Sequence, residues 1–287
     1  MMKTWICVIA LCIFASAAVC GTVYGKMEVT VIKDLNLDVQ PLDIAVSEDG
    51  AMIYILAPGE ILVYESEKEQ IAERFPVDKG FDRIACSGSM NALILTNSQT
   101  KAFRIIQAEQ VFDIPVTGSP FRGKENAAVT LAVFDDYQCP YCSRLEPLFR
   151  ELLKKYPDDM KVVIKNFPLS SHPYARKAAQ AALAADRQGK YGEFHEKLFE
   201  NYRELNDAKV ETIATELGLD MEKFKTDRES PEIDAVIARD LEDGNRIGVR
   251  GTPTMYLNGK QMKIRNPNEL FQKVDAEIRK KKAAPSK

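Results

Sequence analysis

Two cysteines separated by two residues are the part of this chain best suited to chemistry. The motif Cys139-Pro140-Tyr141-Cys142 follows an apolar run that ends at Phe134, and it opens a helix-like run. At the start of a helix, unpaired backbone N–H groups and the positive end of the helix dipole favour a thiolate. A thiolate attacks disulfides, and a cysteine three residues further on can resolve the mixed disulfide. The pattern predicts a thiol–disulfide redox site.

A zinc knuckle or a structural disulfide is the alternative interpretation of such a pair. Structural zinc uses four Cys or His ligands, often from a second CxxC or a His pair. The two histidines, His172 and His195, are too far apart in sequence for a paired-ligand motif. We therefore expect no metal at Cys139 and Cys142, and no cofactor.

Composition bounds the class of protein. The chain has 287 residues, of which 45% are hydrophobic and 28% charged, as expected for a globular protein of about two domains. The formal net charge is −3, and no basic stripe with interleaved aromatic residues occurs. Nucleic acid is therefore excluded as an expected partner.

The N-terminus has the order of a secretory signal. Lys3 precedes an apolar stretch at 5–14, and small residues follow at 15–18. We expect a signal over residues 1–20 and export to the periplasm or cell envelope. An uncleaved membrane anchor is one alternative, although the apolar stretch is short for a membrane span. Lipidation at Cys20 is another, although the preceding valine fits a lipoprotein signal poorly.

Cysteine usage agrees with this location. Of the six cysteines, Cys7 and Cys12 lie inside the expected signal. The remaining ones are too few for a disulfide scaffold, while export implies an oxidising compartment. Cys86 lies in a short strand-like run, and we interpret it as a buried inert thiol in preference to a redox group.

Residues 26–117 have the pattern of a small all-β domain. Short apolar runs alternate with turn signals, and two similar units follow each other 39 residues apart, as the segments Phe75-Pro76-Val77 and Ile114-Pro115-Val116 indicate. About four strands per unit resembles the blades of a β-propeller. Two blades cannot close a ring, so three arrangements stay open: an open sandwich, packing on the redox half, or pairing with a second copy as a homo-oligomer.

A linker at residues 118–123 separates this domain from a redox domain at 124–287. Strand-like runs lie at 129–134 and 161–167, and a helical pattern extends over about 173–243.

The redox half resembles the DsbA-like group of the thioredoxin superfamily. The resemblance rests on the segment from Phe134 to Cys142, on the long helical region and on the segment Val249-Arg250-Gly251-Thr252-Pro253-Thr254. It implies a thioredoxin-like α/β fold with a helical insertion, here preceded by the small all-β domain. It also implies a cis-proline at Pro253, with the Thr252 backbone turned toward a client strand. An ordinary trans-proline turn is the alternative.

The same resemblance implies roles around the cysteines. Cys139 would be the exposed nucleophile, and Cys142 the buried resolving thiol. Pro140 and Tyr141 would tune the pKa of Cys139, because the intervening dipeptide sets which dipoles reach the sulfur.

Five further polar residues near these motifs need an interpretation. Asp135 and Asp136 are candidates for a proton relay to Cys142, with solvated strand-end carboxylates as the alternative. Lys165 is expected to face solvent, and otherwise to lower the pKa of the Cys139 thiol. His172 and His195 are expected to be structural or surface residues.

The sequence thus predicts an exported thiol–disulfide oxidoreductase, with the oxidase direction favoured. Its expected clients are unfolded or partly folded cysteine-containing proteins, and a membrane redox partner would regenerate the disulfide. A disulfide isomerase or reductase kept reduced by a partner is one alternative. A chaperone-like module that binds clients through the β units is another.

Overall fold

The computed structural model describes residues 28–283, and the expected signal at 1–20 with Cys20 lies outside them. The chain folds as two compact units. The β unit contains the chain up to Ala85 together with Leu95–Arg104, and the α/β unit contains Cys86–Ile94 and the chain from Ile105 onward. Within the described residues, no helix combines the length and apolarity needed to span a membrane.

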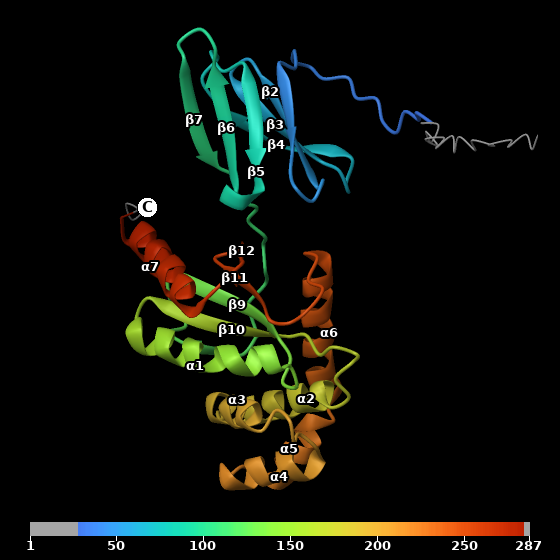
Figure 1. Ribbon diagram of the computed structural model, residues 1–287. Helices are drawn as coiled ribbons and strands as arrows, with labels where there is room; N and C mark the ends of the chain where they lie inside the picture. The colour runs from blue at the N-terminus through green and yellow to red at the C-terminus, as the bar shows by residue number, and fades with distance from the viewer. Residues whose placement is uncertain (1–27, 284–287) are drawn as a thin grey trace, which may run out of the picture. The chain divides into compact units, whose positions relative to one another are not determined.

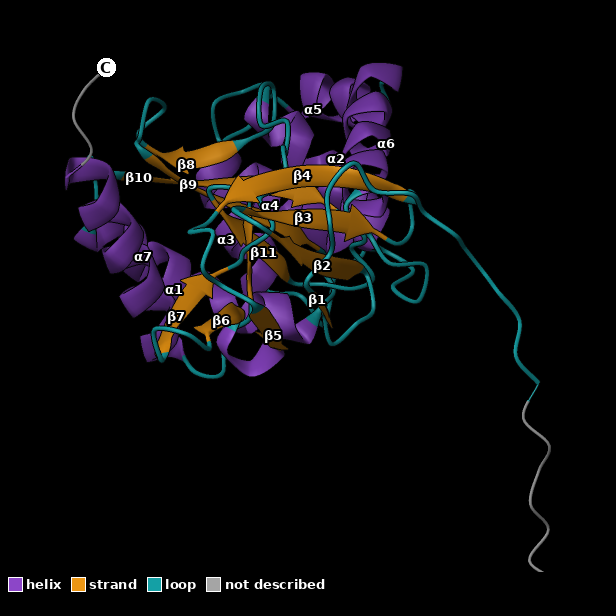
Figure 2. Cartoon of the chain, turned by 90° about the horizontal axis from the view of Figure 1, so that it is seen from above, coloured by secondary structure: helices purple, strands orange, loops and turns teal. Residues whose placement is uncertain are grey.

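A four-stranded antiparallel sheet begins the β unit (Figure 2). Its strands pair in chain order: β1 (Asp43–Val46), β2 (Met52–Ala57), β3 (Glu60–Glu65) and β4 (Gln70–Pro76). The β2–β3 turn uses Gly59 at φ +93°, a conformation that favours glycine. Ile55, Ala57 and Leu62 form a small core on one face, because strand residues two apart share a face.

The second sheet has three strands where the repeat predicted four. Its order is β5 (Arg83–Ser87), β6 (Ala92–Asn97) and β7 (Ala102–Gln107). The expected fourth strand instead bonds within the α/β unit, where Val111 bridges Lys260 and the Phe112 N–H donates to the Gly259 carbonyl at 2.8 Å. Both sheets are open, so the described residues form no propeller. Cys86 on β5 is half-buried, not buried as expected.

The α/β unit is built on a five-stranded sheet in the order β12-β11-β9-β10-β8. These strands are β8 (Phe121–Gly123), β9 (Val129–Asp135), β10 (Met160–Asn166), β11 (Thr254–Leu257) and β12 (Lys260–Met262). The central strands β9 and β10 are parallel, with Val133 opposite Ile164. Both strands are buried almost throughout, which agrees with their continuous apolar sequence.

Strand β8 corrects the expected linker at 118–123. Its three residues pair antiparallel with β10. Gly123 permits this pairing because it has φ +102° and a Cβ there would lie 2.5 Å from the Met160 carbonyl oxygen. The chain therefore enters the α/β sheet before the end of the expected linker.

Helix α1 (Pro140–Lys155) lies along the sheet, and the expected helical insertion is formed by five helices beyond it (Figure 1). They are α2 (Ala175–Asp186), α3 (Tyr191–Glu200), α4 (Asp207–Glu216), α5 (Met221–Arg228) and α6 (Pro231–Arg246). Asn206, Asp220 and Ser230 each accept a hydrogen bond from a first-turn N–H of the helix they precede, which fixes three of the starts. Helix α7 (Pro267–Ala283) ends the described chain.

The two faces of the α/β sheet are covered differently. The larger core joins alternate residues of β9, β10 and β11 to α1, α7 and the insertion, and it includes both CPYC cysteines. On the other face, Phe134 and Tyr256 are packed against Phe112, whose ring centroid lies 5.5 Å from that of Tyr256. Residues 109–119, here called the covering segment, therefore complete the core of the α/β unit.

Candidate active site

The two cysteines begin helix α1 on the face of the larger core. Cys139 is the N-cap residue and Pro140 occupies the first turn, where its missing N–H removes no helical hydrogen bond. Both cysteines are thiols in this structure. Their exposed fractions are 2% for Cys139 and 1% for Cys142. The resemblance implied an exposed Cys139, and the structure corrects this, because the side chain is buried.

The loop before β11 contacts the Cys139 sulfur. The peptide bond between Thr252 and Pro253 is cis. The Thr252 carbonyl oxygen lies 3.4 Å from the Cys139 sulfur. Two contacts fix the loop: Thr254 pairs with Phe134 in the sheet, and its hydroxyl donates to the Gly251 carbonyl at 2.7 Å. Sequence segments more than a hundred residues apart therefore meet at one sulfur atom.

The environment makes the two thiols unequal. A hydrogen bond from the Cys142 thiol lowers the pKa of Cys139 to about 5, with further help from Thr252 and from backbone N–H groups at Cys142 and Tyr141. Burial raises the pKa of Cys142, and the nearby Asp135 carboxyl raises it further. At neutral pH the favoured state has a thiolate at Cys139 and a thiol at Cys142, because only the first pKa lies below 7.

Asp135 contacts the second cysteine. It ends β9 with 5% of its surface exposed, and burial raises its pKa to about 8 against the opposing effect of its hydrogen bond with Cys142. The Asp136 N–H donates to its Oδ1 at 2.9 Å. A carboxyl group with this pKa can accept or return a proton near neutral pH.

Asp136 is placed differently. It is 1% exposed, and it accepts hydrogen bonds from the backbone N–H groups of Gln138 at 2.7 Å and Leu169 at 2.8 Å. The ring Nδ1 of His172 lies 2.9 Å from the same carboxylate. Asp136 therefore ties the loop before Cys139 to the segment after β10. The alternative of solvated strand-end carboxylates is wrong for both aspartates, since both are buried.

Tyr141 supplies an exposed aromatic surface beside the cysteines. Its exposed fraction is 62%, and the Arg144 guanidinium lies over its ring, 4.8 Å from the centroid. Arg144 Nε also donates to the Pro140 carbonyl at 3.2 Å, which holds the guanidinium near the start of α1. The CPYC motif thus presents an ordered aromatic side chain at the surface.

Sequence reasoning missed a buried charged group close to Cys142. Glu146 follows Cys142 by one helical turn and is 4% exposed. It forms an ion pair with Arg122 of β8 and a hydrogen bond with His195 Nε2 of α3 at 2.9 Å. The signal was a glutamate within the apolar face of α1, where a turn-spaced position should carry a hydrophobic residue.

Lys165 is buried, which corrects the expectation of a solvent-facing lysine. Its exposed fraction is zero, and its ammonium forms ion pairs with Asp240 at 2.7 Å and Asp243 at 2.8 Å of α6. It also donates to the Pro115 carbonyl at 3.0 Å. Lys165 lies opposite Phe134 in the register of β9 and β10, on the face that the covering segment completes. Its charge therefore holds α6 and that segment.

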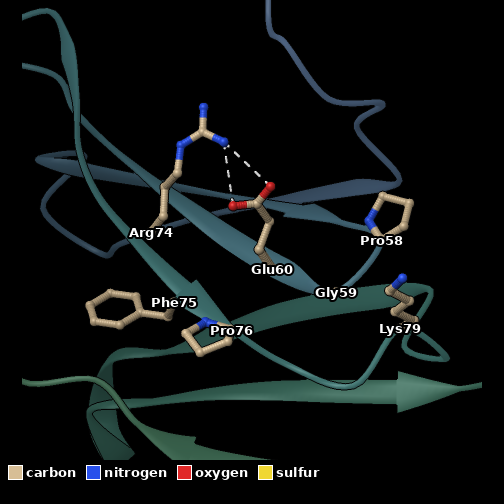
Figure 3. Close-up of a pocket in the computed structure, with 7 residues that line it drawn as sticks. All are labelled: Pro58, Gly59, Glu60, Arg74, Phe75, Pro76 and Lys79. Carbon is tan, nitrogen blue, oxygen red and sulfur yellow. Dashed lines mark hydrogen bonds and ion pairs between the residues drawn. The ribbon is translucent and has the colours of Figure 1, made fainter.

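Two further observations delimit the site. No group of three or more His, Cys, Asp or Glu side chains in the part of the chain that the structure describes could hold a metal ion. A pocket of about 310 Å³ lies in the β unit (Figure 3), where Arg74 pairs with Glu60 at 3.3 Å. It has no thiol, so we assign it no part in redox chemistry. Its lining is Pro58, Gly59, Glu60, Arg74, Phe75, Pro76 and Lys79.

Solved structures resemble the α/β half. A thioredoxin-like oxidoreductase from Silicibacter pomeroyi is 33% identical, with a TM-score of 0.51 over 58% of this chain and 95% of that one. The thiol-disulfide exchange protein alpha-DsbA2 from Wolbachia pipientis is 25% identical, with a TM-score of 0.51 over 56% of this chain and 87% of that one. Each likeness covers most of the other protein.

Curated relatives match about half of the chain. The Na(+)/H(+) antiporter NhaA 3 of Salinispora tropica is 36% identical over 159 residues, which are 54% of this chain. The chain spans only 24% of that relative's length. The family model described as Thioredoxin matches residues 116–276, which is more than half of the chain. The chain therefore belongs to the thioredoxin family, and its C-terminal half is a DsbA-like member of the thioredoxin superfamily.

Proposed function

We propose that this protein is an exported thiol–disulfide oxidoreductase that forms or exchanges disulfides in client proteins. The observation that carries the proposal is the unequal cysteine pair. Cys139 has a pKa lowered to about 5 at the start of α1, while burial raises the pKa of Cys142. A nucleophilic thiolate beside a resolving thiol is the arrangement that disulfide exchange requires.

In the oxidase direction, a client thiolate attacks Cys139 Sγ of the enzyme disulfide. The Cys139–Cys142 bond breaks, and Cys142 leaves as a thiolate that takes a proton from Asp135. A second client thiolate then attacks the client sulfur of the mixed disulfide and releases Cys139 as a thiolate. Two electrons pass from the client to the enzyme pair, so the client gains one disulfide as the enzyme loses its own. Asp135 suits its part because its pKa of about 8 leaves it largely protonated at neutral pH.

The low pKa of Cys139 favours the oxidase direction. Stabilising the thiolate stabilises the reduced enzyme, which makes its disulfide a stronger oxidant. A lower pKa also makes Cys139 the better leaving group when the mixed disulfide resolves. An isomerase or reductase kept reduced by a partner stays the alternative, because the same exchange steps run in either direction.

Clients would bind across the loop at Thr252 and Pro253, next to Tyr141. An extended segment can pair with exposed loop backbone, and the neighbouring aromatic ring adds contact area. This binding mode suits unfolded or partly folded proteins with accessible cysteines. Each oxidation leaves the enzyme pair reduced, so a membrane redox partner would have to regenerate the disulfide.

Trapping of mixed disulfides tests the proposal. The Cys142→Ser variant should accumulate a mixed disulfide with a client that carries a disulfide. The Cys139 thiolate attacks that disulfide and releases one client thiolate, and the resolving thiol that would break the mixed disulfide is gone. The matched Cys139→Ser variant should accumulate none, since it lacks the nucleophile. Non-reducing electrophoresis and mass spectrometry give the readout. Equal trapping by both variants would refute the assigned roles, and trapping by neither would refute the function.

A further inference from the structure

A buried histidine connects the two sides of the CPYC motif. His195 of α3 has an exposed fraction of zero. Its Nδ1 lies 2.9 Å from the hydroxyl of Tyr137, two residues before Cys139. Its Nε2 lies 2.9 Å from Glu146 Oε2, one helical turn after Cys142. A single imidazole therefore contacts both the loop that enters the motif and the helix that leaves it.

The hydrogen bonds define the protonation of this network. A carboxylate only accepts, so the hydrogen between His195 and Glu146 belongs to Nε2. In a neutral ring, Nδ1 then accepts from the Tyr137 hydroxyl. The Tyr191 hydroxyl lies 3.2 Å from that of Tyr137 and can donate to its oxygen. The Tyr191 hydroxyl also lies 3.3 Å from His195 Nδ1, so both tyrosine hydroxyls have an acceptor within the network.

Titratable groups from four elements lie around Glu146 and its partner Arg122. Arg122 of β8 pairs with Glu146 and also, at 2.6 Å, with Glu196 of α3. Asp135 at the end of β9 and Cys142 of α1 complete the surroundings. Burial works against the ionised form of Glu146, but the hydrogen bond from His195 and the charge of Arg122 outweigh it, so the pKa of Glu146 is lowered. The Glu146 charge in turn helps to raise the pKa of Asp135.

We propose that His195 is a positioning residue for the cysteine pair. It holds an ionised Glu146 one turn from Cys142, and it fixes Tyr137 in the loop before Cys139. Through the Glu146 charge it adds to the larger effect of burial on Asp135, and so contributes to the pH range in which Cys142 exchanges its proton. This inference rests on the proposed function, because it concerns the same cysteine pair.

Packing is the competing explanation for His195. Its ring lies edge-on to Phe199, with centroids 4.9 Å apart, and edge-on to Tyr137 at 5.4 Å. If packing were its whole role, phenylalanine would replace it with no effect on the redox properties of the cysteines. The two explanations therefore separate at His195→Phe, which keeps an aromatic ring and removes both nitrogens.

The test is the reduction potential of the cysteine pair as a function of pH, measured in glutathione buffers. For wild type, we expect an inflection near pH 8 from Asp135. In His195→Phe, Glu146 loses the hydrogen bond from Nε2 and keeps only Arg122 as a stabilising partner, so less of it should be ionised and the inflection should move to lower pH. The exchange constant with glutathione should rise by about threefold, or roughly 14 mV for a two-electron couple. His195→Gln can still donate to Glu146 and should remain near wild type.

Phe199→Leu is the packing control, because it disturbs the same rings and leaves the hydrogen bonds in place. An unchanged inflection in folded His195→Phe, or an equal shift in Phe199→Leu, would overturn the inference. If His195→Phe does not fold, Glu146→Gln decides, since removing that charge must also lower the inflection. A wild-type protein that never exchanges with glutathione would overturn the proposed function as well. Normal exchange with unchanged variants would overturn the role of His195 alone.

Discussion

Two clusters of buried charge lie on opposite faces of the α/β sheet, and only one of them adjoins the cysteines. The active-site cluster consists of Arg122, Glu146 and His195, one helical turn from Cys142. The covering-segment cluster consists of Lys165, Asp240 and Asp243, and it contacts the Pro115 carbonyl.

The clusters have opposite designs. In the first, one carboxylate contacts two basic side chains. Its charge helps to raise the pKa of Asp135, which is hydrogen-bonded to Cys142. In the second, one ammonium is shared by two carboxylates, and it holds α6 against residues 109–119. A buried charge is therefore no marker of an active site by itself, since structural ion pairs are buried too. Its distance from the reacting thiols decides its role.

The largest effect on stability is expected at Lys165. Replacing it by Met leaves Asp240 and Asp243 buried without their shared ammonium. Breaking a buried ion pair on one side costs about 3–5 kcal/mol of unfolding free energy. The pKa of Cys139 should stay unchanged, because the cluster lies on the other face. Denaturant unfolding measures the stability, and thiolate absorbance measures the pKa of Cys139. A shifted Cys139 pKa in a folded Lys165→Met variant would show that the covering-segment cluster also acts on the active site.

Asp135→Asn should raise stability and slow the chemistry. The folded pKa of about 8 lies above the ordinary value of 3.8. The protonated carboxyl's contribution to the free energy of unfolding is therefore complete below pH 3.8 and lost as the pH rises through 8. Asparagine carries no such penalty, so the variant should gain on the order of a few kcal/mol over wild type at pH 8–9 and little at pH 4. Exchange that needs the Cys142 proton should slow by roughly 100-fold.

An Asp135→Asn variant with wild-type rates would show that the active-site cluster does not act through this carboxyl. Asp136→Asn is the matched comparison. Its carboxylate accepts two backbone hydrogen bonds. This change should lower stability and leave the inflection assigned to Asp135 in place.

The thiolate of Cys139 should make the stability of the reduced protein depend on pH. Its folded pKa of about 5 lies below the ordinary value of 9.0. The stabilisation is therefore complete above pH 9 and lost as pH falls through 5. Reduced wild type should lose stability over this range relative to Cys139→Ala, as unfolding at a series of pH values would measure. A pH-independent difference would mean that Cys139 is not a stabilised thiolate.

The smallest effect is expected where the covering segment meets solvent. Arg239 of α6 donates to the carbonyls of Thr117 and Gly118 at 3.4 Å and to the Ser119 hydroxyl at 3.1 Å. These are long bonds from a side chain that is 38% exposed. Arg239→Ala should cost about 0.5–1.5 kcal/mol and speed amide exchange near Ser119. A change in the reduction potential of the cysteine pair in Arg239→Ala would show that the two faces of the sheet are coupled.

The reacting groups were predictable because local sequence determines them. The CxxC spacing and the helix start place Cys139 and Cys142, and the segment around Pro253 carries a resemblance of its own. The helical insertion was predictable from periodicity. The proximity of Thr252 to Cys139 depends on the pairing of β11 with β9, which no local pattern specifies.

The charged clusters were harder to predict. Lys165 and Glu146 each look like a solvated side chain next to apolar neighbours, since their partners come from distant segments. The same limit explains the missing fourth strand of the second β sheet. The run at 111–116 has strand-like alternation, but Phe112 and Ile114 find their apolar partners in the α/β unit. The local sequence predicts an extended segment, but it does not specify the surface against which that segment packs.

The most direct test of the account is the equilibrium reduction potential of the Cys139–Cys142 pair in glutathione buffers at pH 7. The lowered pKa of Cys139 predicts an oxidising pair, with a potential of about −120 mV. A value of about −270 mV, as for a reducing pair, would contradict the oxidase direction. A pair that never equilibrates with glutathione would contradict the redox function itself.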